Sequence, residues 1–197
     1  NEAPTYEAAG GLDEAIAAID ELAAHPRVRA IGETGLDFFR TDAEGQPAQY
    51  RSFEAHIALA KKHGIAMQIH DRDAHDEVLR LLESVGAPEK TVFHCFSGDA
   101  EMARIAADRG YYLSFAGNIT FKNAQNLRDA LAVTPAERIL VETDAPFLTP
   151  VPHRGRPNAP YLVPITLRFM AAELGVSVDE LAAQVAANTL EVYGTFA

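Results

Sequence analysis

The sequence predicts an α/β fold in which a parallel sheet is covered by helices. Short apolar runs alternate along the chain with amphipathic stretches of helical period, and polar turns separate them. No strong linker interrupts this order, so we expect one domain over residues 1–197. A flavodoxin-like open sheet and part of a (β/α)8 barrel both satisfy the pattern.

The expected elements follow one another regularly along the chain. Leu12, Ile16 and Ile19 recur at helical spacing in the first helix, which ends before Pro26. The expected helices are residues 12–24, 49–63, 74–84, 99–109, 123–132, 163–174 and 178–193. The expected strands are residues 28–33, 65–70, 91–96, 111–116 and 138–143.

Local signals mark several helix ends. Gly64 follows the second expected helix as a C-cap. Thr134 and Glu137 have the spacing of a capping box, which predicts a further helical turn before the last strand. Ser177 and Glu180 repeat this spacing at the start of the final helix.

Composition and charge exclude several classes of protein. The chain is 48 % hydrophobic and 23 % charged, as in an ordinary globular domain. No apolar stretch approaches the roughly 18 residues of a membrane span, so we expect no membrane partner. The single cysteine cannot form an internal disulfide and fits a reducing, cytoplasmic location. The net charge of −11 argues against coating nucleic acid, so a phosphate substrate needs local cations.

Four of the five expected strands end in a side chain that can bind a divalent metal. These residues are Glu33, His70, His94 and Asp144. A strand-end carboxylate often caps a helix, and a histidine in an apolar strand is often a core residue. Because parallel strands end on one side of a sheet, however, we expect all four to converge at one mouth. Two imidazoles and two carboxylates are plausible ligands for zinc, manganese or magnesium.

The segments around these residues resemble a known family. They are residues 32–37 (GETGLD), 70–74 (HDRDA), 94–98 (HCFSG) and 142–148 (ETDAPFL), with further similarity at 117–122 and 154–160. In this order they resemble the TatD family of metal-dependent deoxyribonucleases, within the amidohydrolase-type TIM-barrel superfamily. The resemblance covers essentially the whole chain and implies a (β/α)8 barrel fold.

The resemblance also implies an activity and a division of roles. Glu33 would bridge two divalent ions (Mg, Mn or Zn), and His70 and His94 would bind one of them. Asp144 would bind the other and act as general base on a metal-held water. The implied reaction is 3′-5′ exonucleolytic cleavage of phosphodiester bonds in DNA, with single strands or 3′ ends as substrate.

Other polar residues near the strand ends are candidates for substrate binding or support. Asp37 and Glu142 are expected to orient metal ligands, although loop stabilisation or a structural salt bridge explains them equally well. Cys95 alternates with His94, so we expect it in the core. The candidates for substrate binding, with solvated charge as the alternative, are Arg72, Lys122, Arg154 and Arg156.

The chain departs from the family pattern on its N-terminal side. The His-x-His pair that ends the family's first strand is absent, and only five strands are expected where a barrel has eight. A barrel also typically needs about 250 residues. We therefore expect an N-terminally incomplete TatD-type domain that lacks about three β/α units. The alternatives are a small-molecule amidohydrolase and an inactive, self-associating barrel fragment.

Overall fold

The computed structural model describes residues 2–195, and the chain divides into two compact units. The first unit holds the residues up to Val92 and from Tyr193 onward, and the second is Phe93–Val192. Among the described residues, no single helix has the length and hydropathy to cross a membrane, although the bent pair 160–174 and 178–193 passes a combined test of length and composition. The single hydrolase domain stays a prediction.

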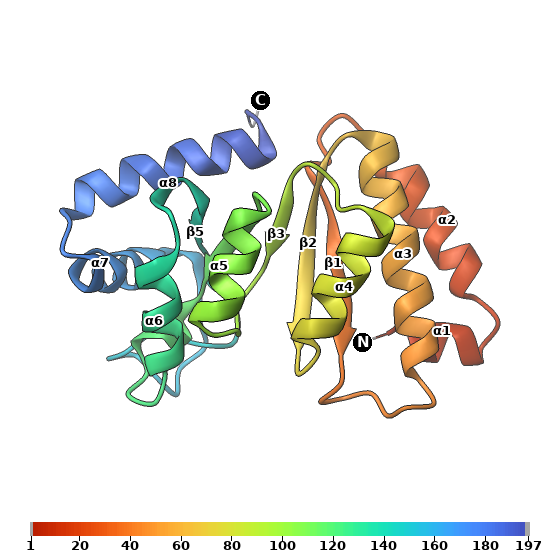
Figure 1. Cartoon of the computed structure of the whole chain (residues 1–197), viewed down its shortest axis with the longest axis horizontal. Coiled ribbons are helices and arrows are strands. Elements are labelled where there is room, and N and C mark those ends of the chain that lie inside the picture. Colours follow the sequence, from red (N-terminus) through yellow and green to blue (C-terminus); the bar gives the residue numbers. More distant parts are fainter. Residues whose placement is uncertain (1, 196–197) are drawn as a thin grey trace. The chain divides into compact units, whose positions relative to one another are not determined.

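The first unit is built around two parallel strands. Its elements are α1 (Ala3–Ala8), α2 (Leu12–Ala23), β1 (Ala30–Asp37), α3 (Gln46–His63), β2 (Ala66–Arg72) and α4 (His75–Val85). Strands β1 and β2 run parallel and pair from Ala30↔Ala66 to Asp37↔Arg72. Helix α3 connects them and packs on β1, while α1 and α2 pack on α3 (Figure 1). This is the βαβ arrangement that the alternating pattern predicts.

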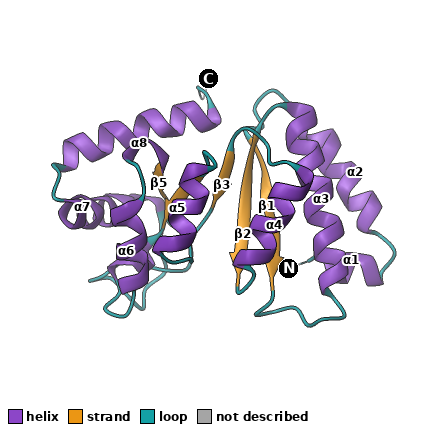
Figure 2. Ribbon diagram, in the orientation of Figure 1, coloured by secondary structure: helices purple, strands orange, loops and turns teal. Residues whose placement is uncertain are grey.

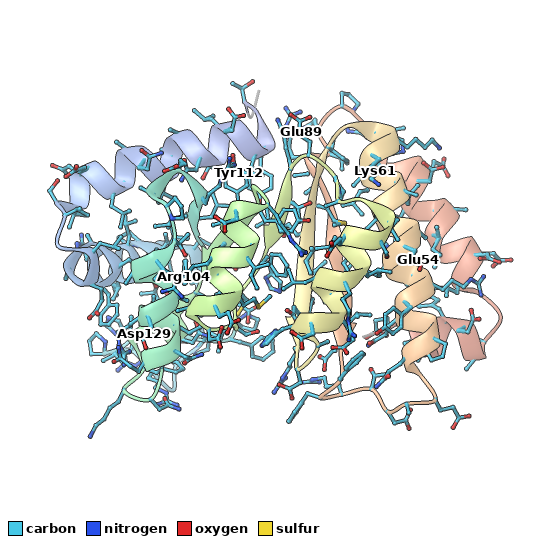
Figure 3. The ribbon with its side chains drawn as sticks, in the orientation of Figure 1. Glu54, Lys61, Glu89, Arg104, Tyr112 and Asp129 are labelled. Carbon is cyan, nitrogen blue, oxygen red and sulfur yellow. The ribbon has the colours of Figure 1, made fainter. Side chains whose placement is uncertain are left out.

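Helix α3 has one face in the core and one in solvent. Phe53 and Ile57 are fully buried on its inner face, as is Leu36 of β1. Glu54 and Lys61, labelled in Figure 3, are exposed on the same helix. The helix ends at Gly64, which adopts the left-handed conformation of a C-cap, as the sequence predicts.

The second unit repeats the βα arrangement with shorter strands. Its elements are α5 (Ala100–Asp108), β4 (Tyr112–Phe115), η1 (Gly117–Thr120), α6 (Gln125–Val133), η2 (Ala136–Arg138), β5 (Ile139–Val141), η3 (Pro160–Leu162), α7 (Val163–Leu174) and α8 (Val178–Tyr193), while β3 (Thr91–Phe93) crosses the boundary between the units. Strands β4 and β5 are parallel. Helix α5 packs on β4 and α6, and α7 packs on β5 and η1 (Figure 2).

Aromatic side chains fill the core of the second unit. The rings of Phe93, Phe96 and Phe115 lie edge to face, with centroids 6.5 Å and 5.8 Å apart along the series. Tyr112, labelled in Figure 3, is buried with its ring 4.9 Å below the guanidinium of Arg138. Such rings bury large apolar areas and lock the strands to the covering helices.

The parallel α/β fold predicted from the sequence is confirmed, with local differences. Ser177 caps α8 by accepting a hydrogen bond from the Glu180 amide at 3.1 Å. The further helical turn predicted before the last strand is confirmed as the 3₁₀ helix η2, but the capping box at Thr134 is wrong, because the Thr134 hydroxyl donates to the carbonyl of Ala130. Strands β3 and β5 are shorter than expected, and the six-residue helix α1 was not predicted. The expected strand ends at Glu33 and His70 are wrong, because the pairing of β1 with β2 continues to Asp37 and Arg72.

Candidate functional site

A histidine lies between two carboxylates in the first unit. Nδ1 of His70 is 3.5 Å from Oε1 of Glu33, and Nε2 of the same ring is 3.0 Å from Oδ2 of Asp37. We call Glu33, Asp37 and His70 the first cluster. All three residues lie on the paired strands β1 and β2, and the ladder pairs His70 with Gly35 and Asp37 with Arg72.

An irregularity in β1 sets the position of Glu33. The register between β1 and β2 shifts between Ile31 and Thr34, as in a β-bulge, and bulges commonly redirect side chains at active sites. The Glu33 side chain is 47 % exposed. Glycine is required nearby, because a Cβ at Gly35 would lie 2.0 Å from the carbonyl oxygen of His70. A side chain at Gly35 would therefore displace the histidine.

Asp37 is the buried member of the first cluster, with a side chain 1 % exposed. Its own amide donates to the side chain of Gln49. Burial by itself raises the pKa of this carboxyl. The Arg40 amide, which donates at 2.8 Å, the ring of His70 and the charge of Arg72 outweigh burial, so the pKa of the carboxyl lies below its ordinary value. Asp37 is therefore an anionic acceptor facing the His70 ring.

A second histidine–carboxylate pair lies in the second unit. Nδ1 of His94 is 3.2 Å from Oε2 of Glu142, whose other oxygen accepts from the Cys95 amide. His94 follows β3 and Glu142 follows β5, so both lie just beyond strands. The Glu142 amide donates to the carbonyl of Phe115, which extends the ladder between β4 and β5 by one bond. We call His94, Glu142 and Asp144 the second cluster.

Asp144 lies in the loop after β5 and adopts a left-handed backbone conformation, with φ of 58°. Its Oδ2 lies 4.0 Å from the sulfur of Cys95. The expectation that Cys95 faces the core is therefore wrong. Strand alternation fails there because β3 ends at Phe93 and Cys95 itself has φ of 44°.

Asn158 organises the loop that carries Asp144, and the sequence did not single it out. Its side-chain amide donates to the carbonyls of Thr143 at 2.8 Å and Phe147 at 2.7 Å. Its own amide donates to the carbonyl of Pro146. The only signal in the sequence is an asparagine within a proline-rich segment. Backbone carbonyls often lack partners in regular structure there, and a side-chain amide can donate to them.

The four cationic candidates have different surroundings. The guanidinium of Arg72 lies 3.8 Å from the ring centroid of Phe39, and that of Arg154 lies 4.1 Å from that of Phe121. Each pair lies within one unit, in or beside the loops that follow strands. The remaining two candidates, Lys122 and Arg156, have exposed side chains. Arg72 lies at the carboxyl end of β2 and the other three lie in loops beyond strands, the side where parallel folds bind ligands.

Both histidines have the surroundings typical of metal ligands, in which a carboxylate fixes one ring nitrogen. Asp37 holds Nε2 of His70, so Nδ1, beside Glu33, is the nitrogen that would bind a metal. Glu142 holds Nδ1 of His94, so Nε2 would bind in the second cluster. Imidazole nitrogen and carboxylate oxygen suit zinc, manganese or magnesium. The residues present fit the divalent metals predicted from the sequence.

A pocket of about 310 Å³ adjoins the first cluster within the first unit. Its apolar wall comes from Leu12, Ile16 and Ile19 of α2. Its polar lining includes Glu33 and His70 of the first cluster. Pockets of this size and mixed lining are typical of small-molecule sites.

The structure thus places the candidate metal ligands and their supporting carboxylates in two clusters, each within one unit. Arg72 interacts with the first cluster, because its charge contributes to lowering the pKa of Asp37. The convergence of Glu33, His70, His94 and Asp144 on one mouth stays a prediction, and so do their individual catalytic roles.

The chain was compared with known proteins. The pattern of the family described as "TatD related DNase" matches residues 4–194. The uncharacterized metal-dependent hydrolase TatD of Mycobacterium tuberculosis is 45 % identical, over 92 % of this chain and 70 % of the relative. The uncharacterized metal-dependent hydrolase YcfH of Escherichia coli is 44 % identical, over 82 % of this chain and 61 % of the relative. A protein of Erwinia amylovora named "3'-5' ssDNA/RNA exonuclease TatD" is 35 % identical, over 92 % and 72 %.

The chain is also similar in fold to a solved structure. The crystal structure of YjjV, a TatD homologue from Escherichia coli, superposes with a TM-score of 0.87 at 28 % identity. The alignment covers 93 % of this chain and 71 % of YjjV. The chain spans 61 % to 72 % of the length of the curated relatives named above. The protein belongs to the TatD related DNase family.

Proposed function

We propose that the protein is a metal-dependent hydrolase that cleaves phosphodiester bonds in DNA, releasing nucleotides from a 3′ end. One observation carries the proposal. Each of two histidines that follow the family motif is oriented by a carboxylate, Asp37 for His70 and Glu142 for His94. A carboxylate that holds one ring nitrogen orients the other nitrogen to bind a metal. Histidines with a purely structural role do not need this arrangement at both positions.

In this proposal the protein's own residues divide the work. Glu33, His70, His94 and Asp144 would be metal ligands, with Asp37 and Glu142 orienting the imidazole rings. Asp144 would also accept the proton of the attacking water. When bound, the metal supplies Lewis acidity toward the phosphate and lowers the pKa of the attacking water. Arg72, Lys122, Arg154 and Arg156 offset the repulsion between the substrate and a chain of net charge −11.

Two further features support a nucleic-acid substrate. The Erwinia amylovora relative carries a name that specifies 3′-5′ cleavage of single-stranded DNA and RNA. The four cationic side chains lie in loops or at a strand end, on the side of the strands where parallel folds bind ligands. We extend the same substrate class to this chain.

The experiment follows shortening of a 5′-labelled single-stranded oligonucleotide in the presence of Mg²⁺ or Mn²⁺. We expect a ladder of products that shortens from the 3′ end, abolished by EDTA and by Asp144→Asn. Glu54→Gln, an exposed change on α3, serves as the control and keeps the activity. Absence of metal-dependent cleavage by the unaltered protein would overturn the proposal.

The pocket beside Glu33 and His70 favours one second candidate, hydrolysis of a small amide or ester. Its apolar wall from α2 offers a surface for a small organic substrate. Turnover of an amide or ester panel, with no release of nucleotides from DNA, would select this candidate over the nuclease.

A further inference from the structure

Phe39 exposes its ring directly beside the first cluster. The residue lies two positions after β1 and is 63 % exposed. The guanidinium carbon of Arg72 lies 3.8 Å from the centroid of this ring, in the geometry of a cation–π contact. An exposed aromatic alone is ordinary, but one with a cation stacked on it offers a flat, positively charged surface.

Arg72 and the residue that precedes Phe39 are held by backbone bonds. Asp37 pairs with Arg72 at the end of the β1–β2 ladder, and the amide of Phe38 donates to the Arg72 carbonyl at 2.9 Å. The ring of Phe38 packs against Tyr50, with centroids 6.4 Å apart. The segment entering Phe39 is therefore fixed to the sheet, and the ring is presented at little further entropic cost.

The pair is connected to the candidate metal ligand His70. Arg72 follows His70 by two residues on β2, so the two side chains leave the strand on the same face. Asp37 is the ladder partner of Arg72, and its carboxylate contacts Nε2 of His70 at 3.0 Å. A group that stacks on Phe39 would thus lie next to the first cluster.

Nucleobases are the chemical class that such a surface suits best. A base stacks on an aromatic ring whatever its sequence, and arginine adds attraction for the adjoining phosphate. The second unit has a similar pair, Arg154 over Phe121, but Phe121 is partly buried and offers less of its ring. The more accessible platform is that of Phe39.

We infer that Phe39, backed by Arg72, is a stacking platform for one base of a single-stranded nucleic acid held at the first cluster. This inference rests on the proposed function and adds a positioning residue to it. Phe39 takes no part in bond cleavage; it fixes the substrate by its base and leaves the chemistry to the carboxylates and histidines.

The experiment compares two fluorescent oligonucleotides, one with normal bases and one with abasic residues at its 3′ end. Binding is measured by anisotropy in EDTA, where no hydrolysis occurs, for the unaltered chain and for Phe39→Ala, Phe39→Tyr and Tyr161→Ala. Tyr161 is the control, an exposed aromatic of the second unit, 78 % exposed. Phe39→Ala is expected to weaken binding of the normal strand by about 5- to 100-fold, the worth of one stacked base.

The abasic strand should respond little to Phe39→Ala, and Phe39→Tyr should restore binding of the normal strand. In hydrolysis assays with Mn²⁺, Phe39→Ala should raise KM and leave kcat near its original value. Equal effects on both strands, effects matched by Tyr161→Ala, or no preference of the unaltered chain for the normal strand would overturn the platform. Base-dependent binding without any metal-dependent cleavage would overturn the nuclease proposal and leave the platform intact.

Discussion

The two histidine–carboxylate clusters are built by different means. In the first unit, Glu33, Asp37 and His70 lie on neighbouring strands whose ladder extends to the last residue of each. In the second unit, His94 and Glu142 lie beyond three-residue strands and Asp144 lies in a loop. Backbone pairing therefore fixes Asp37 and His70 of the first cluster, whereas the second cluster depends on hydrogen bonds from side chains to loop backbone.

This difference predicts how strongly each cluster responds when a supporting contact is removed. A side chain on a paired strand keeps its place when one contact is removed, because the ladder remains. A loop residue depends on particular polar side chains, here Glu142 at the Cys95 amide and Asn158 at two loop carbonyls. The second cluster should thus lose more when its supporting contacts are removed.

The largest expected effect comes from the candidate catalytic carboxylates, one from each cluster. Glu33→Gln and Asp144→Asn should each lower the rate of DNA hydrolysis by about 10²- to 10⁴-fold, because each removes a metal ligand or proton acceptor. Steady-state kinetics on a single-stranded oligonucleotide measure the loss. If either variant kept its full rate while Glu54→Gln also did, that cluster would have no part in the reaction.

Removing the carboxylates that orient the histidines comes next in size. Asp37→Asn and Glu142→Gln should weaken binding of Mn²⁺ by about 10- to 100-fold, since each loosens a ligand ring. Glu142→Gln should lie at the upper end, because it also weakens the contact to the Cys95 amide. Calorimetric titration measures both affinities, and a larger loss in Asp37→Asn would contradict the proposed contrast between strand and loop.

Loss of the Asn158 amide is expected to cost about 1–3 kcal/mol, because two loop carbonyls, of Thr143 and Phe147, lose their donor. Thermal unfolding of Asn158→Ala measures this cost, with the exposed Asn123→Ala as the matched control. Equal melting temperatures for the two variants would show that the loop does not depend on Asn158.

The smallest expected effect concerns pH and the core of the first unit. Burial lowers the pKa of His56 below its ordinary value, against a smaller opposite effect of the Ser52 carbonyl. The unfolded chain binds this proton more readily than the folded chain does. The contribution of neutral His56 to the free energy of unfolding is therefore fully present above about pH 6.5 and decreases as the pH falls from there. The melting temperature should therefore fall more between about pH 8 and about pH 5.5 in the unaltered chain than in His56→Asn. A steeper fall of the melting temperature in His56→Asn than in the unaltered chain would contradict this prediction.

The order of elements could be predicted from the sequence, and so could the strands that carry or precede the candidate ligands. Alternation of apolar runs and helical periods suffices for β1, α3 and β2, but β1 and β2 continue past Glu33 and His70 to Asp37 and Arg72. Both predictions rest on local periodicity, which needs no knowledge of tertiary contacts.

The loops could not be predicted in the same way. Strand alternation misplaced Cys95, because the chain leaves β3 at Phe93 and turns through a left-handed residue. The contacts of Asn158 and the stacking of Arg72 on Phe39 join residues that are distant in sequence. Such contacts follow from loop conformation, which residue spacing does not determine.

Titration of Mn²⁺ into the unaltered chain, His70→Ala, His94→Ala and the double variant tests the central claim, that both histidines are metal ligands. Each single change is expected to weaken binding by at least about 100-fold. If both histidines serve the single mouth predicted from the sequence, the double change should cost less than the sum of the two. Metal content and affinity unchanged in His70→Ala or in His94→Ala would contradict the account.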